Sequence, residues 1–169
     1  MRIRAERPGD EAAIREVNRL AFGRGDEANL VAALRDGGHI RVSLVAEVED
    51  EGEGVCEIIG HVLFSEVSAE GLPKVLALAP VAVAPDWQGV GIGSAMIEAG
   101  VKASAAEGHD AIFVLGEPAY YSRFGFSTEA ARNFDTPYPK ECFMALEFAD
   151  GSLGGASGRI EYPPPFKGG

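Results

Sequence analysis

The sequence predicts an α/β (α+β) fold in which strands and helices share one core. Near the N-terminus, Ile14, Val17 and Leu20 recur at helical spacing and predict the core-facing stripe of a helix. Short, nearly continuous apolar runs, such as residues 111–115, predict buried strands. A glycine-rich turn joins one apolar strand to a further helix. Strands and helices therefore follow one another along the chain, as they do in α/β proteins.

The expected elements form a single domain over residues 1–169, because no repeat or change in composition marks a boundary. In chain order they are a strand at 3–4, a helix from 9 or 10 to 21, a second helix ending before 37, strands at 42–48, 57–67 and 75–83, a helix from the glycine-rich turn to about 107, a strand at 111–115, a short helix ended by a glycine at 125, a strand from 126, a strand at 142–148 and an edge strand at 159–162. The acidic segment 49–54 is expected at a hairpin tip, since buried charges need partners. Residues 150–169 form a Gly/Pro-rich C-terminal extension, in which prolines 163–165 predict an extended end.

Composition excludes several classes of function. The net charge is −11, with 15 basic against 26 acidic residues, and this argues against a nucleic-acid partner because such binding needs a basic face. No apolar run is as long as a membrane span and the N-terminus reads as a strand, so we expect a cytoplasmic protein without membrane insertion. Cys56 and Cys142 lie in apolar strands, and we interpret them as buried free thiols. Neither belongs to a Cys/His ligand pattern, so we expect no metal.

Residues 88–94 carry the strongest functional signal, since glycines alternate where a helix begins. Missing side chains leave backbone N–H groups unhindered at the positive end of a helix dipole, which is a ready site for phosphate. A nucleoside-triphosphate P-loop would need Gly-Lys-Ser/Thr, and the sequence has none. A dinucleotide fingerprint counted from Gly89 would need a sixth-position glycine where Ser94 stands. A turn without any ligand is a further alternative, and the form Gln-x-x-Gly-x-Gly from Gln88 is the last.

The form Gln-x-x-Gly-x-Gly resembles the pyrophosphate loop of the GNAT superfamily of acyl-CoA N-acyltransferases. A second segment, from Tyr121 to Phe126, resembles the Tyr-x-x-x-Gly-Phe element of the same superfamily. In that element Gly125 would end a short helix in a conformation that a side chain resists. The order of elements over residues 1–148 resembles the GNAT fold, and segments such as 60–64 resemble one bacterial branch of small acetyltransferases.

The resemblance implies a central mixed, mostly antiparallel sheet, flanked by helices and splayed open at a cofactor cleft. It implies acetyl-CoA, or another acyl-CoA, as co-substrate, and no metal. The pantetheine arm would enter the splay between the strands ending at Val83 and Leu115. The residues that the resemblance assigns to the cofactor are Val81, Val83, Gln88, Gly89, Val90, Gly91, Ile92, Gly93, Ser94, Glu117, Tyr120 and Phe124.

The implied chemistry is transfer of an acyl group, acetyl in the first place, to a primary amine by direct attack on the thioester. Tyr121 matches the general acid of the superfamily, which protonates the leaving thiolate. Residues 75–83 contain no titratable residue where many relatives carry a base. His61 and Glu66, on the preceding strand, are the candidate bases. The alternatives are a hydrogen-bonded core histidine, a solvated strand end, and water as the base.

The expected acceptor partner is a small-molecule amine or a protein amine, and the resemblance allows a homodimer. Arg24, Asp26 and Glu27, between the first two helices, are the candidate acceptor-binding residues, with helix capping as the alternative. An acidic surface would steer a cationic amine toward the protein. A sensor domain that binds acyl-CoA without transferring the acyl group is the alternative function, and a nucleotide-binding module is a third.

Overall fold

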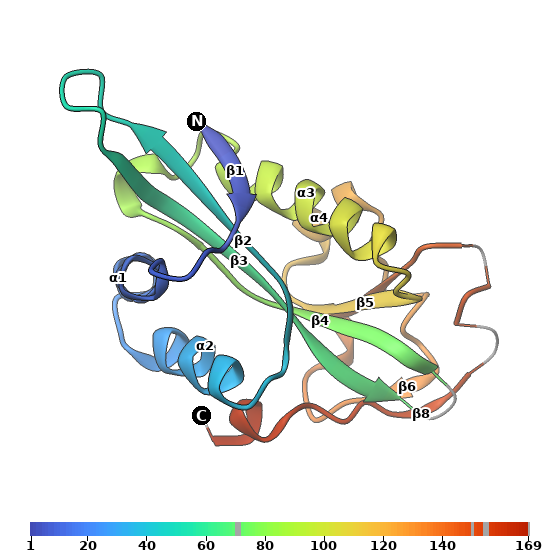
Figure 1. Cartoon of the computed structure of the whole chain (residues 1–169). Coiled ribbons are helices and arrows are strands. Elements are labelled where there is room, and N and C mark those ends of the chain that lie inside the picture. The colour runs from blue at the N-terminus through green and yellow to red at the C-terminus, as the bar shows by residue number, and fades with distance from the viewer. Residues whose placement is uncertain (70–71, 150, 154–155, 169) are drawn as a thin grey trace.

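Six strands form one sheet in the order β1–β2–β3–β4–β5–β7, in a computed structural model that describes residues 1–69, 72–149, 151–153 and 156–168 (Figure 1). The strands are β1 (Arg2–Ala5), β2 (Ile40–Glu49), β3 (Cys56–Ala69), β4 (Leu72–Val83), β5 (Ala111–Leu115) and β7 (Phe143–Glu147). Neighbouring strands are antiparallel except β4 and β5, which are parallel. The predicted mixed, mostly antiparallel sheet is therefore confirmed.

Helices cover both faces of this sheet (Figure 1). The helices are α1 (Glu11–Phe22), α2 (Asp26–Asp36), α3 (Ile92–Ala106) and the short α4 (Pro118–Tyr121). Side chains alternate between the faces of a strand, so Leu63 of β3 packs with α1 and α2. Its neighbours Val62 and Phe64 pack with α3. The two helical layers therefore share the central strands β2, β3 and β4.

The predicted core-facing side of α1 is wrong at its last residue, Leu20. Ile14 and Val17 of α1 are buried as expected, but Leu20 is 43% exposed. Leu20 follows Ile14 by six residues, which turns its side chain about 240° around the helix and off the inner face. The polar Asn18 is buried instead. Sequence hydrophobicity therefore missed a polar residue at the interface between α1 and the sheet.

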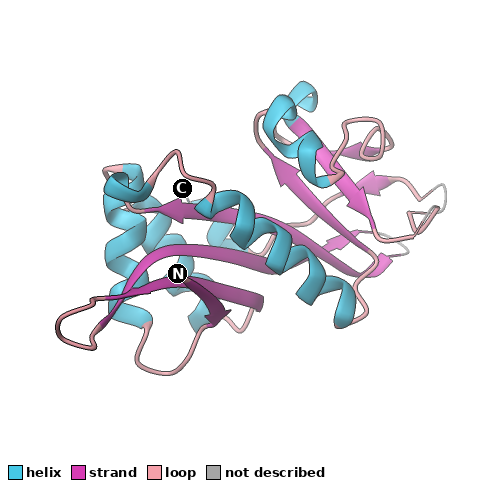
Figure 2. Ribbon diagram, turned by 90° about the horizontal axis from the view of Figure 1, so that it is seen from above, coloured by secondary structure: helices cyan, strands magenta, loops and turns pink. Residues whose placement is uncertain are grey.

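The sheet splays open between β4 and β5. These strands pair only from Val75 with Ala111 to Ala77 with Phe113, and β4 then continues to Val83 without β5 beside it. A register shift between β3 and β4, at the positions of Val62 and Phe64, lies just beyond the last paired residues. Such irregularities bend a strand and increase its twist. The strands accordingly separate into two diverging groups (Figure 2), as the family resemblance implies.

The chain after β5 corrects three smaller predictions. Phe126 begins no strand, and only its neighbour Ser127 forms a single bridge, with Ala145. The expected edge strand is the two-residue β8 (Gly158–Arg159), which pairs with β6 (Phe134–Asp135) and not with the main sheet. The proline-rich end is not extended but forms a 3-10 helix (Pro164–Gly168), because its Phe166 packs beside α2. Residues 150, 154, 155 and 169 of the predicted extension lie outside the described residues.

A further correction concerns the two cysteines, which were expected to be buried. Cys56 is exposed at the start of β3 and Cys142 is partly exposed, and both are free thiols. Cys56 is the first residue of its strand, and Cys142 ends the 3-10 helix Lys140–Cys142 directly before β7, so neither lies in the buried middle of a strand. Among the described residues, no helix has both the length and the apolar character that crossing a membrane requires.

Candidate functional site

The glycine-rich turn joins β4 to α3 at the open end of the splay. Gly89 and Gly91 have positive φ angles of +79° and +88°, a region in which side chains are strained. A Cβ atom at either position would meet nothing within 4 Å, so the space beside the backbone is open. Gly91 is the N-cap of α3, and no side-chain hydrogen bond caps the helix there. The first N–H groups of α3 are therefore free to bind an anion.

A cleft of about 420 Å³ lies beside this turn. It is lined by Val83, Trp87, Gln88, Gly89, Gly91, Ile92, Gly93, Ser94, Tyr120 and Arg123. The two sequence motifs, far apart in the chain, thus contribute to one cleft. Seven of the residues assigned to the cofactor from the turn and β4 line it, and Tyr120 joins them from α4. Val90 belongs to the same turn but points outward and is exposed.

Tyr120 and Arg123 connect the short helix to the start of α3. The Tyr120 hydroxyl lies 3.3 Å from Ser94 Oγ, and a Cβ atom added to Gly93 would lie 3.4 Å from that hydroxyl. Arg123 places its guanidinium over the Tyr120 ring, 5.3 Å from the centroid, and donates a hydrogen bond of 3.5 Å to Ser94 Oγ. Phe124 supports the arrangement through an edge contact with Tyr120, at 5.3 Å between centroids. Phe124 itself does not line the cleft.

Sequence reasoning missed Arg123 and Trp87. Of the described residues that line the cleft, Arg123 is the charged one. Its signal was available, because Tyr120 and Arg123 stand three residues apart in a short helical segment, where side chains meet on one face. Trp87 comes directly before Gln88 and ends the 3-10 turn Pro85–Trp87. An aromatic residue beside a glycine-rich turn does not by itself predict that it lines a binding site.

The ring of Tyr121 makes an edge contact with the ring of Tyr120, at 5.0 Å between centroids, and packs against the core on the α3 side. Its ring lies against Gly116, where a side chain would collide with it, and 5.9 Å from the ring of Phe126. Burial raises the pKa of the Tyr121 phenol to about 12, so the phenol keeps its proton at neutral pH. No hydrogen bond to its hydroxyl is found among the described residues. Gly125, with φ of +98°, ends the segment as predicted.

The remaining residues assigned to the cofactor have different surroundings. Val81 and Val83 are half-buried, and their side chains pack on the α3 side of the core. Gln88 donates a hydrogen bond of 2.9 Å from Nε2 to the carbonyl oxygen of Val83, which closes the turn from within. Glu117 is exposed before α4 and does not line the cleft. Its carbonyl oxygen accepts the N–H groups of the first turn of α4.

The structure does not bring the candidate bases to the cleft. His61 is fully buried on the opposite face of the sheet, and both ring nitrogens have partners, Asn18 at 3.1 Å and Ser43 at 3.0 Å. Burial lowers the pKa of His61 to about 3, which is a poor value for a base at neutral pH. Glu66 pairs on the surface with Arg41 and His39. Neither candidate base is among the described residues that line the cleft.

The candidate acceptor residues also lie apart from the cleft. Arg24 forms an ion pair with Glu27 at 2.8 Å and lies 3.9 Å from Asp26, at the start of α2. Asp26 and Glu27 lie in the first turn of α2, where carboxylates are favoured, and Arg24 precedes the helix. Among the described residues, no side chain caps α2 by a hydrogen bond, and a role of these three residues in acceptor binding stays a prediction.

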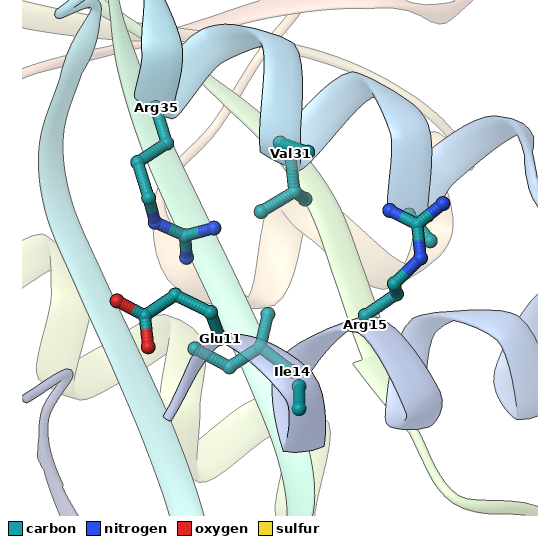
Figure 3. A pocket seen from close by; sticks show the side chains of 8 residues that line it. Glu11, Ile14, Arg15, Val31 and Arg35 are labelled. Atoms are coloured by element: carbon teal, nitrogen blue, oxygen red, sulfur yellow. The ribbon is translucent and has the colours of Figure 1, made fainter. Parts of the chain in front are cut away.

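A second, smaller cavity of about 170 Å³ lies between α1 and α2 (Figure 3). Arg15 and Arg35 line it, and Ile14 and Val31 form its apolar floor. None of the residues assigned to a site from the sequence lines this cavity. In the described part of the chain, no group of three His, Cys, Asp or Glu side chains is placed to hold a metal ion.

Comparison with known proteins agrees with this geometry. Residues 39–128 match the family model of an acetyltransferase (GNAT) domain. The sequence is 35% identical over 169 residues to the uncharacterised N-acetyltransferase YhbS of Escherichia coli K12, covering 98% of each chain. A solved structure of Escherichia coli YhbS with CoA superposes with a TM-score of 0.88 at 34% identity, covering 98% of this chain and 91% of that one. A GNAT family acetyltransferase of Brucella melitensis, solved with acetyl-CoA, gives a TM-score of 0.77 at 33% identity, covering 98% of this chain and 97% of that one.

Proposed function

The chain belongs to the GNAT family of N-acetyltransferases, and we propose that the cleft at the start of α3 is where it binds acyl-CoA for transfer to an amine. One observation carries this proposal: the free N–H groups of α3 and the guanidinium of Arg123 face the same cleft. Two similar structures hold CoA and acetyl-CoA. Acetyl-CoA is accordingly the acyl donor that we propose.

The residues of the cleft suit a phosphorylated ligand. The turn around Gly89 and Gly91 offers open backbone N–H groups, and Arg123 adds a cation held in place by two aromatic rings. Such local attraction matters because the net charge of −11 repels an anionic ligand at long range. The part of β4 near Val81 and Val83, which β5 leaves unpaired, would receive the pantetheine arm.

The acyl donor supplies an activated thioester. Tyr121 holds a proton on its hydroxyl throughout the neutral range and would deliver it to the sulfur that leaves. General acid catalysis of this kind contributes about 10²–10⁴ in rate. The phenol regains its proton from solvent after each cycle.

The amine has to lose a proton before it can attack, since an alkylammonium has a pKa of about 10.4. Neither a carboxylate nor an imidazole is among the described residues that line the cleft. We therefore assign this proton to water. The acceptor itself is a primary amine, of a small molecule or of a protein.

Thermal unfolding with CoA, acetyl-CoA, NAD and ATP tests the cofactor site, because a ligand of the folded state raises the melting temperature. We expect shifts with the CoA compounds alone, and their loss in Gly91→Glu. Gly54→Glu is the matched control, since Gly54 also has a positive φ and open surroundings, at a hairpin tip. No shift in the wild type would refute the site. A shift without thiol release in an amine screen would favour the acyl-CoA sensor.

A further inference from the structure

A buried chain of polar side chains runs beneath α1 and α2, on the face of the sheet opposite α3. Asn18 Nδ2 lies 3.1 Å from His61 Nδ1, and His61 Nε2 lies 3.0 Å from Ser43 Oγ. Ser43 then donates a hydrogen bond of 2.9 Å to Glu6 Oε1, which also accepts one of 2.7 Å from Arg35. The chain connects α1, β3, β2, the segment after β1, and α2. Asn18 and His61 are fully buried.

The hydrogen bonds in this chain have one direction. Asn18 Nδ2 also donates to the carbonyl oxygen of Ile14, at 2.9 Å, so a reversed amide would bring two oxygens together there. The amide nitrogen of Asn18 therefore faces His61, and His61 Nδ1 accepts. The proton of the neutral imidazole is then on Nε2, which donates to Ser43, whose own hydroxyl proton goes to Glu6. Among the described residues, the one polar atom of this chain that is buried without a hydrogen-bond partner is Asn18 Oδ1.

The chain lies directly behind the part of β4 proposed for the acyl donor. His61 pairs with Ala82 across β3 and β4, and paired residues share a face of the sheet. Val81 and Val83, on either side of Ala82, point to the α3 face. Asn18 belongs to the C-terminal half of α1, which packs on both β3 and β4. The hydrogen bond between Asn18 and His61 thus holds α1 against the sheet at the open end of the splay.

Stability alone does not explain this arrangement. The oxygen Oδ1 of Asn18 is buried without a hydrogen-bond partner among the described residues, which costs stability. Apolar side chains of similar size would fill the same space without that cost. What the polar chain adds is a unique position, because directional hydrogen bonds accept one placement of α1 where an apolar contact would accept several. At its other end Arg35 reaches the cavity between α1 and α2 (Figure 3), so the whole helical pair is tied to β3.

We propose that Asn18, His61 and Ser43 are positioning residues that fix α1 against the end of β4 and so fix the position of the strand whose Val83 lines the reaction cleft. This inference rests on the proposed function for its effect on catalysis, but its structural part does not. His61 takes no proton from the amine. It acts through α1, whose C-terminal half would move if the imidazole lost its partners.

His61→Phe tests this proposal, since it fills the space but makes neither hydrogen bond. His61→Gln is the conservative variant, because its amide oxygen can accept from Asn18 and its nitrogen can donate to Ser43. Ser65→Ala is the matched control, a buried polar residue of the same strand outside the chain. Hydrogen exchange of backbone amides gives a readout that needs no acceptor. We expect faster exchange in α1 and not in α3 for His61→Phe, recovery in His61→Gln, and no change in Ser65→Ala.

Kinetics with acetyl-CoA and a peptide carrying a free α-amine add the functional readout. We expect kcat to fall by about tenfold or more in His61→Phe, because small displacements of the reacting groups cost much rate. The KM for acetyl-CoA and the CoA-induced thermal shift should not change. Unchanged exchange in α1, or exchange that rises equally in α1 and α3, would overturn the positioning role. A wild type that binds CoA but releases no thiol would refute the proposed function, and the exchange result would still decide the positioning role. If His61→Phe does not fold, Ser43→Ala replaces it in the same comparison.

Discussion

The hydroxyl of Tyr120 lies 3.3 Å from the hydroxyl of Ser94, and this contact joins two motifs that are far apart in the chain. Ser94 belongs to the first turn of α3, and Tyr120 to the short helix after β5. Arg123 stacks on Tyr120 and reaches the same serine. A cation, two hydroxyl groups and the positive end of a helix dipole therefore meet at one side of the cleft, where phosphate groups are best stabilised.

Replacing Arg123 by Gln should weaken CoA binding. A hydrogen bond to a charged group is typically worth about 1.5–3 kcal/mol, so we expect the Kd to rise about tenfold or more. The salt dependence of binding should also decrease, since one fewer cation faces the phosphates. Calorimetric titration at low and high salt measures both effects. Arg132→Gln is the control, because Arg132 pairs with Glu129 on the surface away from the cleft. Equal affinity of Arg123→Gln and wild type at low salt would exclude the role.

Tyr121→Phe should lower kcat without weakening CoA binding. The ring keeps its contacts with Gly116 and Phe126, so the fold should hold, but no proton is available for the leaving sulfur. We expect a loss of about 10²–10⁴ in kcat. Thiol release at saturating acetyl-CoA measures it, with Tyr120→Phe as the control, which removes the neighbouring hydroxyl instead. Turnover retained in Tyr121→Phe would transfer the proton donor to another group.

The glycines of the site could be predicted from sequence because their requirement is local. Gly91 and Gly125 adopt φ angles of +88° and +98°, which almost any other residue resists, and each ends or begins a helix. The contact of Tyr120 with Ser94 is tertiary, and nothing in the sequence says how the short helix folds back over α3. Arg123 stands at a variable position of the Tyr-x-x-x-Gly-Phe element, so the sequence predicted no function for it.

The surroundings of His61 could not be predicted from the sequence for the same physical reason. His61 has the intrinsic pKa of a base, but its partner Asn18 comes from a helix 43 residues away and its burial depends on the whole sheet. Alternation along β3 shows that His61 and Val62 face opposite sides, but not which side carries the cleft.

The prediction of an extended C-terminus was wrong for a different reason. The φ angle of proline suits a 3-10 helix as well as an extended chain, and the packing of Phe166 beside α2 selects the helix.

His61 should make the protein less stable in mild acid. Its pKa is about 3 when folded and 6.5 as the unperturbed value, so below pH 6.5 the unfolded state binds a proton that the folded state excludes. The contribution of His61 to the free energy of unfolding is therefore fully present above pH 6.5. It falls as the pH decreases, by about 2 kcal/mol between pH 6.5 and pH 5. Urea unfolding of wild type and His61→Gln at pH 7.5 and 5 measures this contribution. The variant has no imidazole to titrate, so it should lose less stability. Identical losses in both proteins would contradict the depressed pKa.

The pH dependence of acetyl transfer should follow the acceptor amine and not a group of the enzyme. No carboxylate or imidazole is found among the described residues lining the cleft, so kcat/KM should rise about tenfold per pH unit until the amine itself is neutral. An α-amine would reach its plateau near pH 8 and a lysine amine only near pH 10, following their pKa values of about 7.8 and 10.4. Tyr121 sets no falling limb in this range, because its acid form is lost only as the pH rises through about 12. Two peptides that differ only in whether the free amine is terminal or on lysine provide the comparison. If both gave the same apparent pKa, near 7, a base on the protein would be at work and the assignment of the amine proton to water would be wrong.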